Sequence, residues 1–178
     1  MNRKLQEAAV TDLLTGIYNR AGMYEEIQKM IECYSMSKEV HHVGLMFIDL
    51  DNFKHYNDTF GHDGGDLILK QMAKIFQKAS KGRGFVARYG GDEFIMILNT
   101  DDHEILENIA KGIYEKINAT QGFQQQIEKY LGHAITTTEK SRITCSIGIA
   151  SAGDVRKEED INNGAAGGAC RRDWRAAR

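Results

Sequence analysis

The fold of this chain is most constrained by two apolar runs joined by a very short, glycine-rich connection. The runs, Phe85–Tyr89 and Glu93–Leu98, are of strand length, and only Gly90, Gly91 and Asp92 lie between them. So short a connection needs residues that tolerate positive φ angles, and glycine does so without steric cost. The pattern therefore predicts an antiparallel β-hairpin with acidic residues at its turn.

A second apolar run ends in carboxylates. Val43–Leu50 (VGLMFIDL) is almost continuously apolar, which predicts a buried central strand, and Asp49 and Asp51 come at its end. A carboxylate at the mouth of a sheet is costly to desolvate unless a cation or donors satisfy it, and Mg²⁺ prefers such oxygens together with substrate phosphates. A single Asp in a turn is more often simply solvated. Together with Asp92 and Glu93, however, these acids favour a metal–phosphate site.

Helical periodicity accounts for most of the remaining chain. Apolar residues at helical spacing predict helices over 20–36, over 63–79 with Asp63 as a cap, and over 101–117, where Ile105, Ile109, Ile113 and Ile117 form the apolar face. We also expect a short helical piece over 52–60 before Gly61, a strand over 142–150, and a loop with at most one helical turn over 120–140.

Composition excludes several classes of protein. The 178 residues suffice for one packed domain, and a net charge of -2 leaves no basic excess for nucleic-acid binding. No apolar window of membrane-spanning length and no signal-peptide pattern occur in the sequence. Cys33, Cys145 and Cys170 are odd in number and form no CxxC pair, which disfavours a disulfide framework or a zinc site and fits a reducing compartment.

Two features suggest phosphate binding, each with an ordinary alternative. Gly90 and Gly91 would let a phosphate approach the backbone closely, although such a pair is also common turn chemistry. Lys54 follows Asp51 by three residues, where an ammonium group and a helix N-terminus could both face phosphate oxygens. A solvated surface lysine is the alternative interpretation.

Four ordered motifs resemble one family. RYGGDEF (residues 88–94) resembles the signature of the GGDEF family, the diguanylate cyclases. DLLTGIYNR (12–20) is similar to the opening motif of that family, FIDLDNFKHYNDTFGHDGGD (47–66) to its metal and guanine segment, and ITCSIGIA (143–150) to its late strand. The resemblance covers about residues 10–160, which is far more specific than a Gly-Gly pair alone.

The resemblance implies a fold and a reaction. The expected fold is α/β of the α+β type, a central, mainly antiparallel sheet flanked by helices, similar to the nucleotidyl cyclase catalytic domain and the polymerase palm. The expected reaction condenses two GTP molecules into cyclic di-GMP and releases two pyrophosphates. Because each monomer would hold one GTP, a homodimer is required for product.

The resemblance also assigns the metal and catalytic residues. Asp49 and Asp92 would hold two Mg²⁺ ions, with Mn²⁺ as a possible substitute, the Leu50 carbonyl would be a further ligand, and Glu93 would bind metal or assist. Two metals fit in-line displacement at a phosphate, because they stabilise the charge on the leaving group and lower the pKa of the attacking hydroxyl. Asp92 or Glu93 would accept the proton, and the sequence leaves this choice open.

The substrate-binding residues follow from the same resemblance. Asn57 and Asp66 map to the guanine site, and a carboxylate there can accept hydrogen bonds from both N1–H and the 2-amino group of guanine, a donor pair that adenine lacks. Phe53 and Lys54 would face the triphosphate, together with the glycines of the hairpin turn. We assign Arg20 and Asp12, by contrast, to structure, as an ion pair.

The domain organisation includes two departures from the family. We expect residues 1–10 to be the end of an upstream linker helix, 11–161 to be the GGDEF catalytic domain, and 162–178 to be a disordered tail. Lys81 and Gly84 stand where the family carries the Arg and Asp of its RxxD product-inhibition motif, so we expect no inhibition through that site. The tail, rich in Gly, Ala and Arg, replaces a helix that brings a Lys and an Arg to the triphosphate, which predicts weaker GTP binding or slower turnover.

Two other functions remain in view. A GTP-binding regulatory domain without turnover would fit the changed tail, and a purely structural dimerisation module would leave the acidic cluster unexplained. For the cyclase we expect a cytoplasmic location, an upstream sensor domain in the parent protein, and neither nucleic-acid nor membrane contact from this chain.

Overall fold

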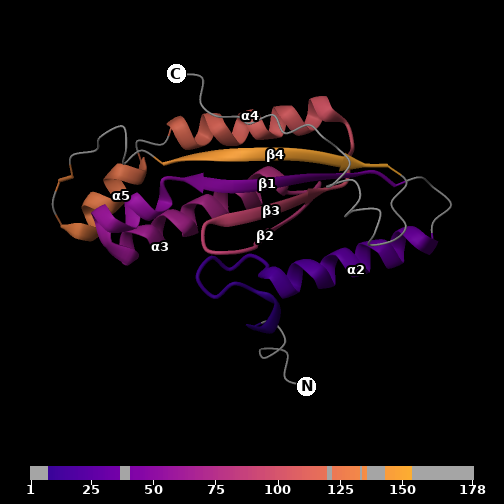
Figure 1. Ribbon diagram of the computed structural model, residues 1–178, viewed down its shortest axis with the longest axis horizontal. Coiled ribbons are helices and arrows are strands. Elements are labelled where there is room, and N and C mark those ends of the chain that lie inside the picture. Colours follow the sequence, from indigo (N-terminus) through magenta and orange to yellow (C-terminus); the bar gives the residue numbers. More distant parts are fainter. Residues whose placement is uncertain (1–7, 37–40, 120–121, 133, 136–142, 154–178) are drawn as a thin grey trace.

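The structure, a computed structural model, describes residues 8–36, 41–119, 122–132, 134–135 and 143–153. Figure 1 shows a central sheet with helices on both of its faces. No helix within these described ranges is long and apolar enough to cross a membrane. The expected tail at 162–178, and most of the expected linker helix at 1–10, lie outside the described residues; residues 8–10 are helical.

The sheet has four strands, each antiparallel to its neighbours. They are β1 (Val43–Asp51), β2 (Gly84–Arg88), β3 (Glu93–Leu98) and β4 (Thr144–Ala152), arranged in the order β2-β3-β1-β4. The β2–β3 hairpin is the predicted one, with strand ends within one residue of the expected positions. The expectation of an antiparallel central sheet is confirmed.

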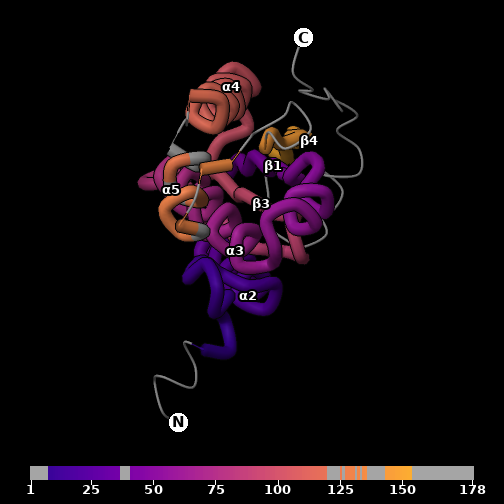
Figure 2. The backbone as a smooth tube through the Cα atoms, turned by 90° about the vertical axis from the view of Figure 1, so that its left-hand side faces the viewer, coloured from indigo at the N-terminus to yellow at the C-terminus, as the bar shows by residue number. Residues whose placement is uncertain are grey.

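Helices cover the two faces of the sheet unequally. They are α2 (Arg20–Met36), α3 (Phe53–Ser80), α4 (His103–Ala119) and α5 (Gly122–Leu131). Figures 1 and 2 show α2 on one side of the sheet and α4 on the other. The buried side chains of α3 and α4 pack on one face with Met46, Ile48 and Leu50 of β1. Helix α2 packs on the opposite face, mainly over β2 and β3.

Alternation along β1 determines which side chains reach each face. Successive strand residues point to opposite faces, so the buried Leu50 belongs to the α3 and α4 side. Asp49 and Asp51 lie on the α2 side, and both are half-buried. The core therefore anchors the strand while the acids project from its other face.

Helix α3 contains the predicted interruption. Gly61 has φ 77° and ψ 168°, so it separates a short first helix from a long second one within α3. This positive φ requires glycine or a strained residue. The kink turns the second half of α3 back along the sheet, so its residues approach those of the first half.

The apolar face of α4 differs from the predicted one. The buried residues are Leu106, Ala110, Ile113 and Ile117, whereas Ile105 and Ile109 are only half-buried. A strict four-residue spacing drifts around a helix that turns every 3.6 residues, so one end of such a row leaves the core. Asp102 caps α4, because its carboxylate accepts hydrogen bonds from the amides of Glu104 and Ile105 at 2.9 and 3.3 Å.

The expected loop at 120–140 is wrong in part, because α5 occupies ten residues of it. Ile127 of α5 is 2% exposed and joins the core shared by α3 and α4. One buried anchor among polar residues gives little periodicity, so tertiary packing determines this helix.

The cysteines are free where the structure describes them. Cys33 is exposed and Cys145 is buried, and burial raises the pKa of the Cys145 thiol to about 12. Cys170 and residue 142 of the predicted last strand lie outside the described residues.

Candidate active site

Strand register brings the acids of β1 and of the hairpin together. Asp49 lies directly opposite Glu93 in the β1–β3 ladder, and the Leu50 amide donates to the Asp92 carbonyl at 3.3 Å. Like charges directly opposite each other in a sheet are destabilising. The pKa of Asp49 is raised, first by burial and then by the charges of Asp92, Glu93 and Asp51. Such an arrangement is suited to a cation.

The two acids of β1 differ in how they are satisfied. Thr144 Oγ1 and Ser146 Oγ donate to the two carboxylate oxygens of Asp51 at 2.6 and 2.7 Å. No side-chain donor of the described residues reaches Asp49, and its pKa is shifted only by burial and like charges. Both oxygens of Asp51 are therefore engaged within the protein, whereas Asp49 keeps its oxygens available for a ligand.

The donor set fits hard divalent cations that share their ligands with a substrate. The carboxylates of Asp49 and Asp92, together with the backbone at Leu50, could offer oxygen ligands at one end of the sheet. Within the described parts of the chain, no three Asp, Glu, His or Cys side chains are grouped closely enough to bind one ion. Phosphate oxygens would have to complete the coordination shell, as Mg²⁺ sites with nucleotides usually require.

Arg88 fixes the hairpin turn. Its Nε and NH2 groups donate to the Gly91 carbonyl at 3.0 and 2.7 Å, while NH1 lies 3.2 Å from both carboxylate oxygens of Asp12. A Cβ on Gly91 would contact nothing within 4 Å, whereas one on Gly90 would lie 2.6 Å from Glu93 Oε2. Arg88 therefore holds the turn through the Gly91 carbonyl. On the side of Gly91 where a Cβ would lie, no neighbouring atom blocks a ligand from the backbone.

The predicted ion pair between Arg20 and Asp12 is wrong. Asp12 pairs with Arg88, and the Arg20 guanidinium lies 4.7 Å from the centre of the Tyr89 ring. The reason is the path of the chain, because Tyr18 bridges to Ala87 and its carbonyl accepts the Arg88 amide at 2.8 Å. That bridge sets the N-terminal turn beside β2 and brings Arg88 to Asp12.

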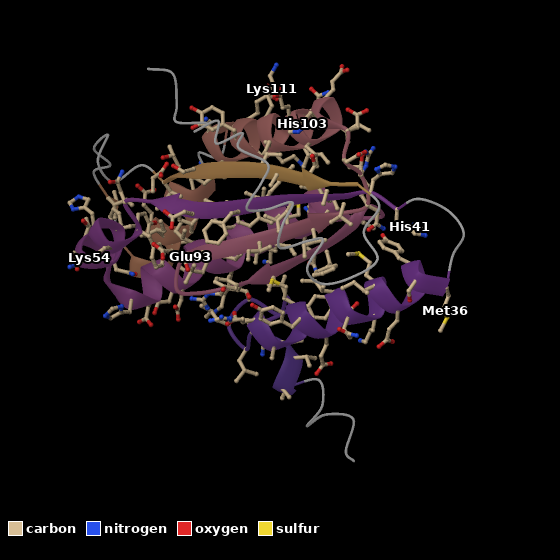
Figure 3. All side chains as sticks on the ribbon, turned by 45° about the vertical axis from the view of Figure 1, so that its right-hand side comes forward. Met36, His41, Lys54, Glu93, His103 and Lys111 are labelled. Carbon is tan, nitrogen blue, oxygen red and sulfur yellow. The ribbon has the colours of Figure 1, made fainter. Side chains whose placement is uncertain are left out.

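A residue in the left-handed conformation lies between the acids and α3. Asn52 has φ 59° and ψ 18°, a left-handed conformation that asparagine tolerates better than most other non-glycine residues. Its side chain does not cap the helix, so the first amides of α3 have no side-chain cap. Figure 3 shows Lys54, exposed on α3, at the same end of the molecule as Glu93. The Phe53 side chain packs against the core, which leaves its backbone for ligand contact.

The Gly61 kink brings the two predicted guanine residues close together. Asn57, on the first half of α3, has a buried Oδ1 without a hydrogen-bond partner. A Cβ on Gly65 would lie 1.8 Å from that atom, so only glycine fits there. Asp66 follows Gly65 and is half-buried. A buried unpaired acceptor is costly in a folded protein, and a ligand donor such as a guanine amino group would satisfy it.

Helix α5 adds a side chain that the sequence analysis missed. The Tyr130 hydroxyl hydrogen-bonds to Asp63, and this bond, with the nearby charge of Asp66, raises the pKa of Tyr130. Ile127 and Tyr130 are three residues apart, which places them on one side of the helix, and this spacing is the signal that could have revealed the contact. Tyr130 is half-exposed and lies near Asp66, one of the two predicted guanine-binding residues.

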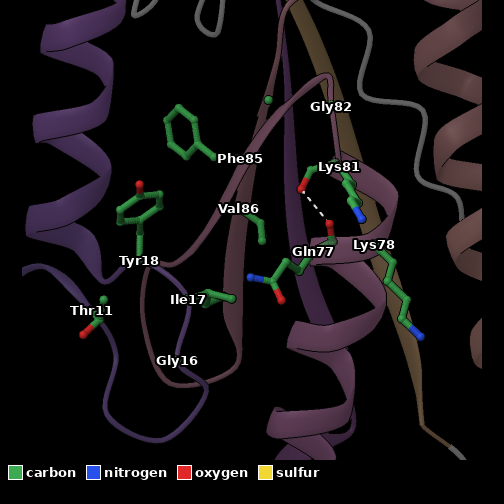
Figure 4. Close-up of a pocket in the computed structure, with 12 residues that line it drawn as sticks. Thr11, Gly16, Ile17, Tyr18, Gln77, Lys78, Lys81, Gly82, Phe85 and Val86 are labelled. Carbon is green, nitrogen blue, oxygen red and sulfur yellow. Dashed lines mark hydrogen bonds between the residues drawn. The ribbon is translucent and has the colours of Figure 1, made fainter. Parts of the chain in front are cut away.

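A separate cavity of about 750 Å³ lies at the opposite end of β2 from the turn. Figure 4 shows Gly16 and Tyr18 on one side of it and Gln77, Lys78 and Lys81 on the other. Gly84 also lines it, and a Cβ at this position would lie 1.9 Å from the Ile97 carbonyl oxygen. An Asp, which the RxxD motif would place here, has no room on this backbone.

The fold and the acidic sheet end define a class, the nucleotidyl cyclase-like α/β domains. Residues 9–165 match the family described as diguanylate cyclase, GGDEF domain, and the chain belongs to this family. The predicted family is thus confirmed.

Curated relatives carry the corresponding name. Diguanylate cyclase A of Treponema denticola is 30% identical over 155 residues, which cover 84% of this chain and 38% of the relative. A diguanylate cyclase of Vibrio cholerae is 33% identical over 132 residues, covering 74% and 40%. This chain therefore spans two fifths or less of these relatives.

Solved structures support the fold. The diguanylate cyclase SiaD of Pseudomonas aeruginosa, in complex with its activator SiaC, superposes with a TM-score of 0.69 at 24% identity over 93% of this chain and 58% of that one. The coiled coil and GGDEF domain of DgcB from Caulobacter crescentus, in complex with c-di-GMP, gives 0.67 at 21% identity over 92% and 80%.

Proposed function

We propose that this domain is a diguanylate cyclase that condenses two GTP molecules into cyclic di-GMP. The 3′-oxygen of each GTP attacks the α-phosphorus of the other, so two phosphodiester bonds form, two pyrophosphates leave and two protons are released. Family membership supports this reaction, and so do the diguanylate cyclase names of the relatives.

The observation that carries the proposal is the pair Asp49 and Glu93. Two acids lie opposite each other in the ladder, beside Asp92, and the pKa of Asp49 is raised first by burial and then by the charges of Asp92, Glu93 and Asp51. A sheet gains no stability from such a pair, whereas a divalent cation bound beside it would offset the repulsion. The raised pKa shows that the charged form of Asp49 is disfavoured in the folded protein, and a bound cation would offset this.

Mg²⁺ fits this donor set, and Mn²⁺, with similar ligand preferences, could replace it. Asp49 and Asp92 would hold two ions, with the Leu50 carbonyl as a further ligand and Glu93 in support. When bound, the ions would offset charge at the α-phosphate and pyrophosphate and lower the pKa of the attacking hydroxyl. The carboxylate of Asp92 or Glu93 would accept the proton of that hydroxyl.

The remaining residues would bind and orient GTP. The uncapped amides of α3 at Phe53, the Lys54 ammonium and the backbone of Gly90 and Gly91, which is open at Gly91, would bind the triphosphate. Asp66 would accept hydrogen bonds from N1–H and the 2-amino group of guanine. The unpaired Oδ1 of Asn57 supports a polar base at this position, because a purine without the 2-amino group would leave it unsatisfied.

Product formation would need two copies of the chain. Each site would bind one GTP, so the attacking 3′-hydroxyl would belong to the GTP that a second protomer holds. We therefore propose a homodimer for turnover. We assign the catalytic domain to residues 11–161 and place it in the cytoplasm, where GTP is available. The greater length of the relatives supports an upstream sensor domain.

The test is incubation of the chain with GTP and Mg²⁺ at high protein concentration, with nucleotides resolved by chromatography. Asp92→Ala is the control, because it removes one carboxylate of the acidic cluster at the turn. Cyclic di-GMP that is absent in the control supports the cyclase.

GTP binding without product would instead favour the regulatory function. The sequence from Asn162 onward motivates that alternative, since it lacks the cationic pattern of the family. In that case Asp66→Ala should still abolish binding.

A further inference from the structure

Asp51 is the second acid of β1, and the proposed reaction gives it no role. Its two carboxylate oxygens are each occupied by a hydroxyl of β4, from Thr144 at 2.6 Å and Ser146 at 2.7 Å. Thr144 is the direct register partner of Asp51, but Ser146 is the partner of Asp49. Ser146 therefore donates diagonally to Asp51 and not to the acid opposite it.

The hydrogen bond from Ser146 makes the two acids of β1 differ in how their oxygens are occupied. They project from the same face two residues apart, and β4 donates a hydrogen bond to each oxygen of Asp51 while Asp49 keeps its oxygens available. Asp51 is thus less available to a cation than Asp49, since both of its oxygens already accept short hydrogen bonds. We refer to Asp51, Thr144 and Ser146 as the β4 clamp.

The position of the β4 clamp in the chain suggests what it holds. Asp51 ends β1, Asn52 follows in the left-handed conformation, and α3 begins at Phe53. The Tyr56 amide donates to the Asn52 carbonyl at 3.0 Å, which starts the helical hydrogen bonds. A single residue therefore connects the clamped strand end to the uncapped amides of the helix.

We propose that Asp51 is a positioning residue, whose β4 clamp fixes the strand-to-helix turn so that Asp49 and the first amides of α3 face one nucleotide phosphate group. This inference rests on the proposed function, because it needs the triphosphate at that turn. It adds a role for three residues that do not touch substrate. Without the clamp, Asn52 would relax from its left-handed conformation and the helix start would shift away from Asp49.

The experiment removes one hydroxyl at a time and measures binding, turnover and local opening. Thr144→Val keeps the shape of the side chain and deletes its donor, Ser146→Ala deletes the other, and Thr144→Ser keeps the hydroxyl. Ser151→Ala is the matched control, since Ser151 lies at the far end of β4 and its hydroxyl is near His103. Calorimetry with a non-hydrolysable GTP analogue and Mg²⁺ gives the affinity, and amide hydrogen exchange reports on residues 53–55.

We expect Thr144→Val and Ser146→Ala each to weaken analogue binding about tenfold, as the loss of one charge-assisted hydrogen bond implies. Both should speed exchange at 53–55, and the fall in kcat/KM for GTP should match the loss of affinity. Thr144→Ser and Ser151→Ala should behave like the wild type.

Two results would overturn the proposal. If Thr144→Val and Ser146→Ala lower the melting temperature but bind the analogue like the wild type, the β4 clamp is only structural. If the wild type itself fails to bind the analogue, the proposed function fails and this inference with it. Comparison with the wild type separates the two failures. Should Thr144→Val not fold, Ser146→Ala, which removes a single oxygen atom, decides the outcome.

Discussion

Arg88 and Asp12 connect the N-terminal turn to the hairpin that carries the acidic site. One guanidinium nitrogen lies 3.2 Å from each carboxylate oxygen of Asp12, and the others hold the carbonyl of Gly91. The pair is largely buried, with 16% and 21% of the two side chains exposed. Its arginine therefore acts both as a structural ion-pair partner and as the support of the turn.

Replacing Arg88 should loosen the turn. In Arg88→Lys the ammonium cannot contact Asp12 and Gly91 together, so we expect the free energy of unfolding to fall by about 2 kcal/mol. Chemical denaturation measures this change. Lys81→Ala is the control, because Lys81 is an exposed residue just before β2, and it should change stability by less than about 0.5 kcal/mol. Equal effects of the two substitutions would contradict the assigned role.

The ion pair between Arg88 and Asp12 makes the stability of the fold depend on pH. Burial alone raises the pKa of Asp12, but hydrogen bonds from Thr15 and the charge of Arg88 outweigh it, so the pKa lies below its usual value of 3.8. A lowered folded-state pKa means that the stabilisation is complete above the unfolded-state value and is lost as the pH falls through the folded-state value.

We therefore expect the stability difference between wild type and Asp12→Asn to be constant near neutral pH and to shrink below pH 3.8. Denaturation curves at a series of pH values measure it. A difference that grows on acidification would show that the pKa is raised instead.

What could be predicted from the sequence was local. Gly90, Gly91 and the acids around them specify a hairpin within a few residues, and the apolar run of β1 places Asp49 at its end. Pairing of β1 with β3 then brings the acids of the hairpin beside Asp49, so that the two local patterns form one site. The break at Gly61 was equally accessible, because only glycine adopts that conformation at no steric cost.

The missed contacts join segments that are distant in sequence. Arg88 and Asp12 are 76 residues apart, and Ser146 reaches Asp51 across 95 residues. No periodicity encodes such pairs, since the order of the strands determines them. Helix α5 was missed for a related reason, because its burial depends on a core that α3 and α4 provide.

Asp49 should be unfavourable for folding when no ligand is bound. Burial and three neighbouring carboxylates raise its pKa, so its charged form opposes the folded state at neutral pH, and this penalty disappears as the pH falls. Asp49→Asn should therefore raise the free energy of unfolding by up to about 1 kcal/mol without metal, as for the removal of a like-charge pair, while abolishing turnover. Thermal melts with and without Mg²⁺ measure this.

The stabilisation should vanish at low pH, where Asp49 is neutral in the wild type as well. Asp102→Asn is the control, because Asp102 is an exposed cap of α4 distant from the acids, and asparagine caps helices about as well. A lower melting temperature for Asp49→Asn without metal would contradict the electrostatic argument.

Gly65→Ala should impair recognition of guanine more than it disturbs the fold. The new methyl group would lie 1.8 Å from Asn57 Oδ1, so the Asn57 side chain must turn away from its place. We expect the affinity for GTP to fall by about tenfold or more, because a ligand donor loses its buried partner. Affinity for inosine triphosphate, which lacks the 2-amino group, should fall less.

Gly112→Ala is the matched control, since a Cβ there meets nothing within 4 Å, and it should stabilise α4 by about 0.5–1 kcal/mol without changing nucleotide affinity. Equal losses for the two nucleotides in Gly65→Ala would place Asn57 away from the 2-amino group.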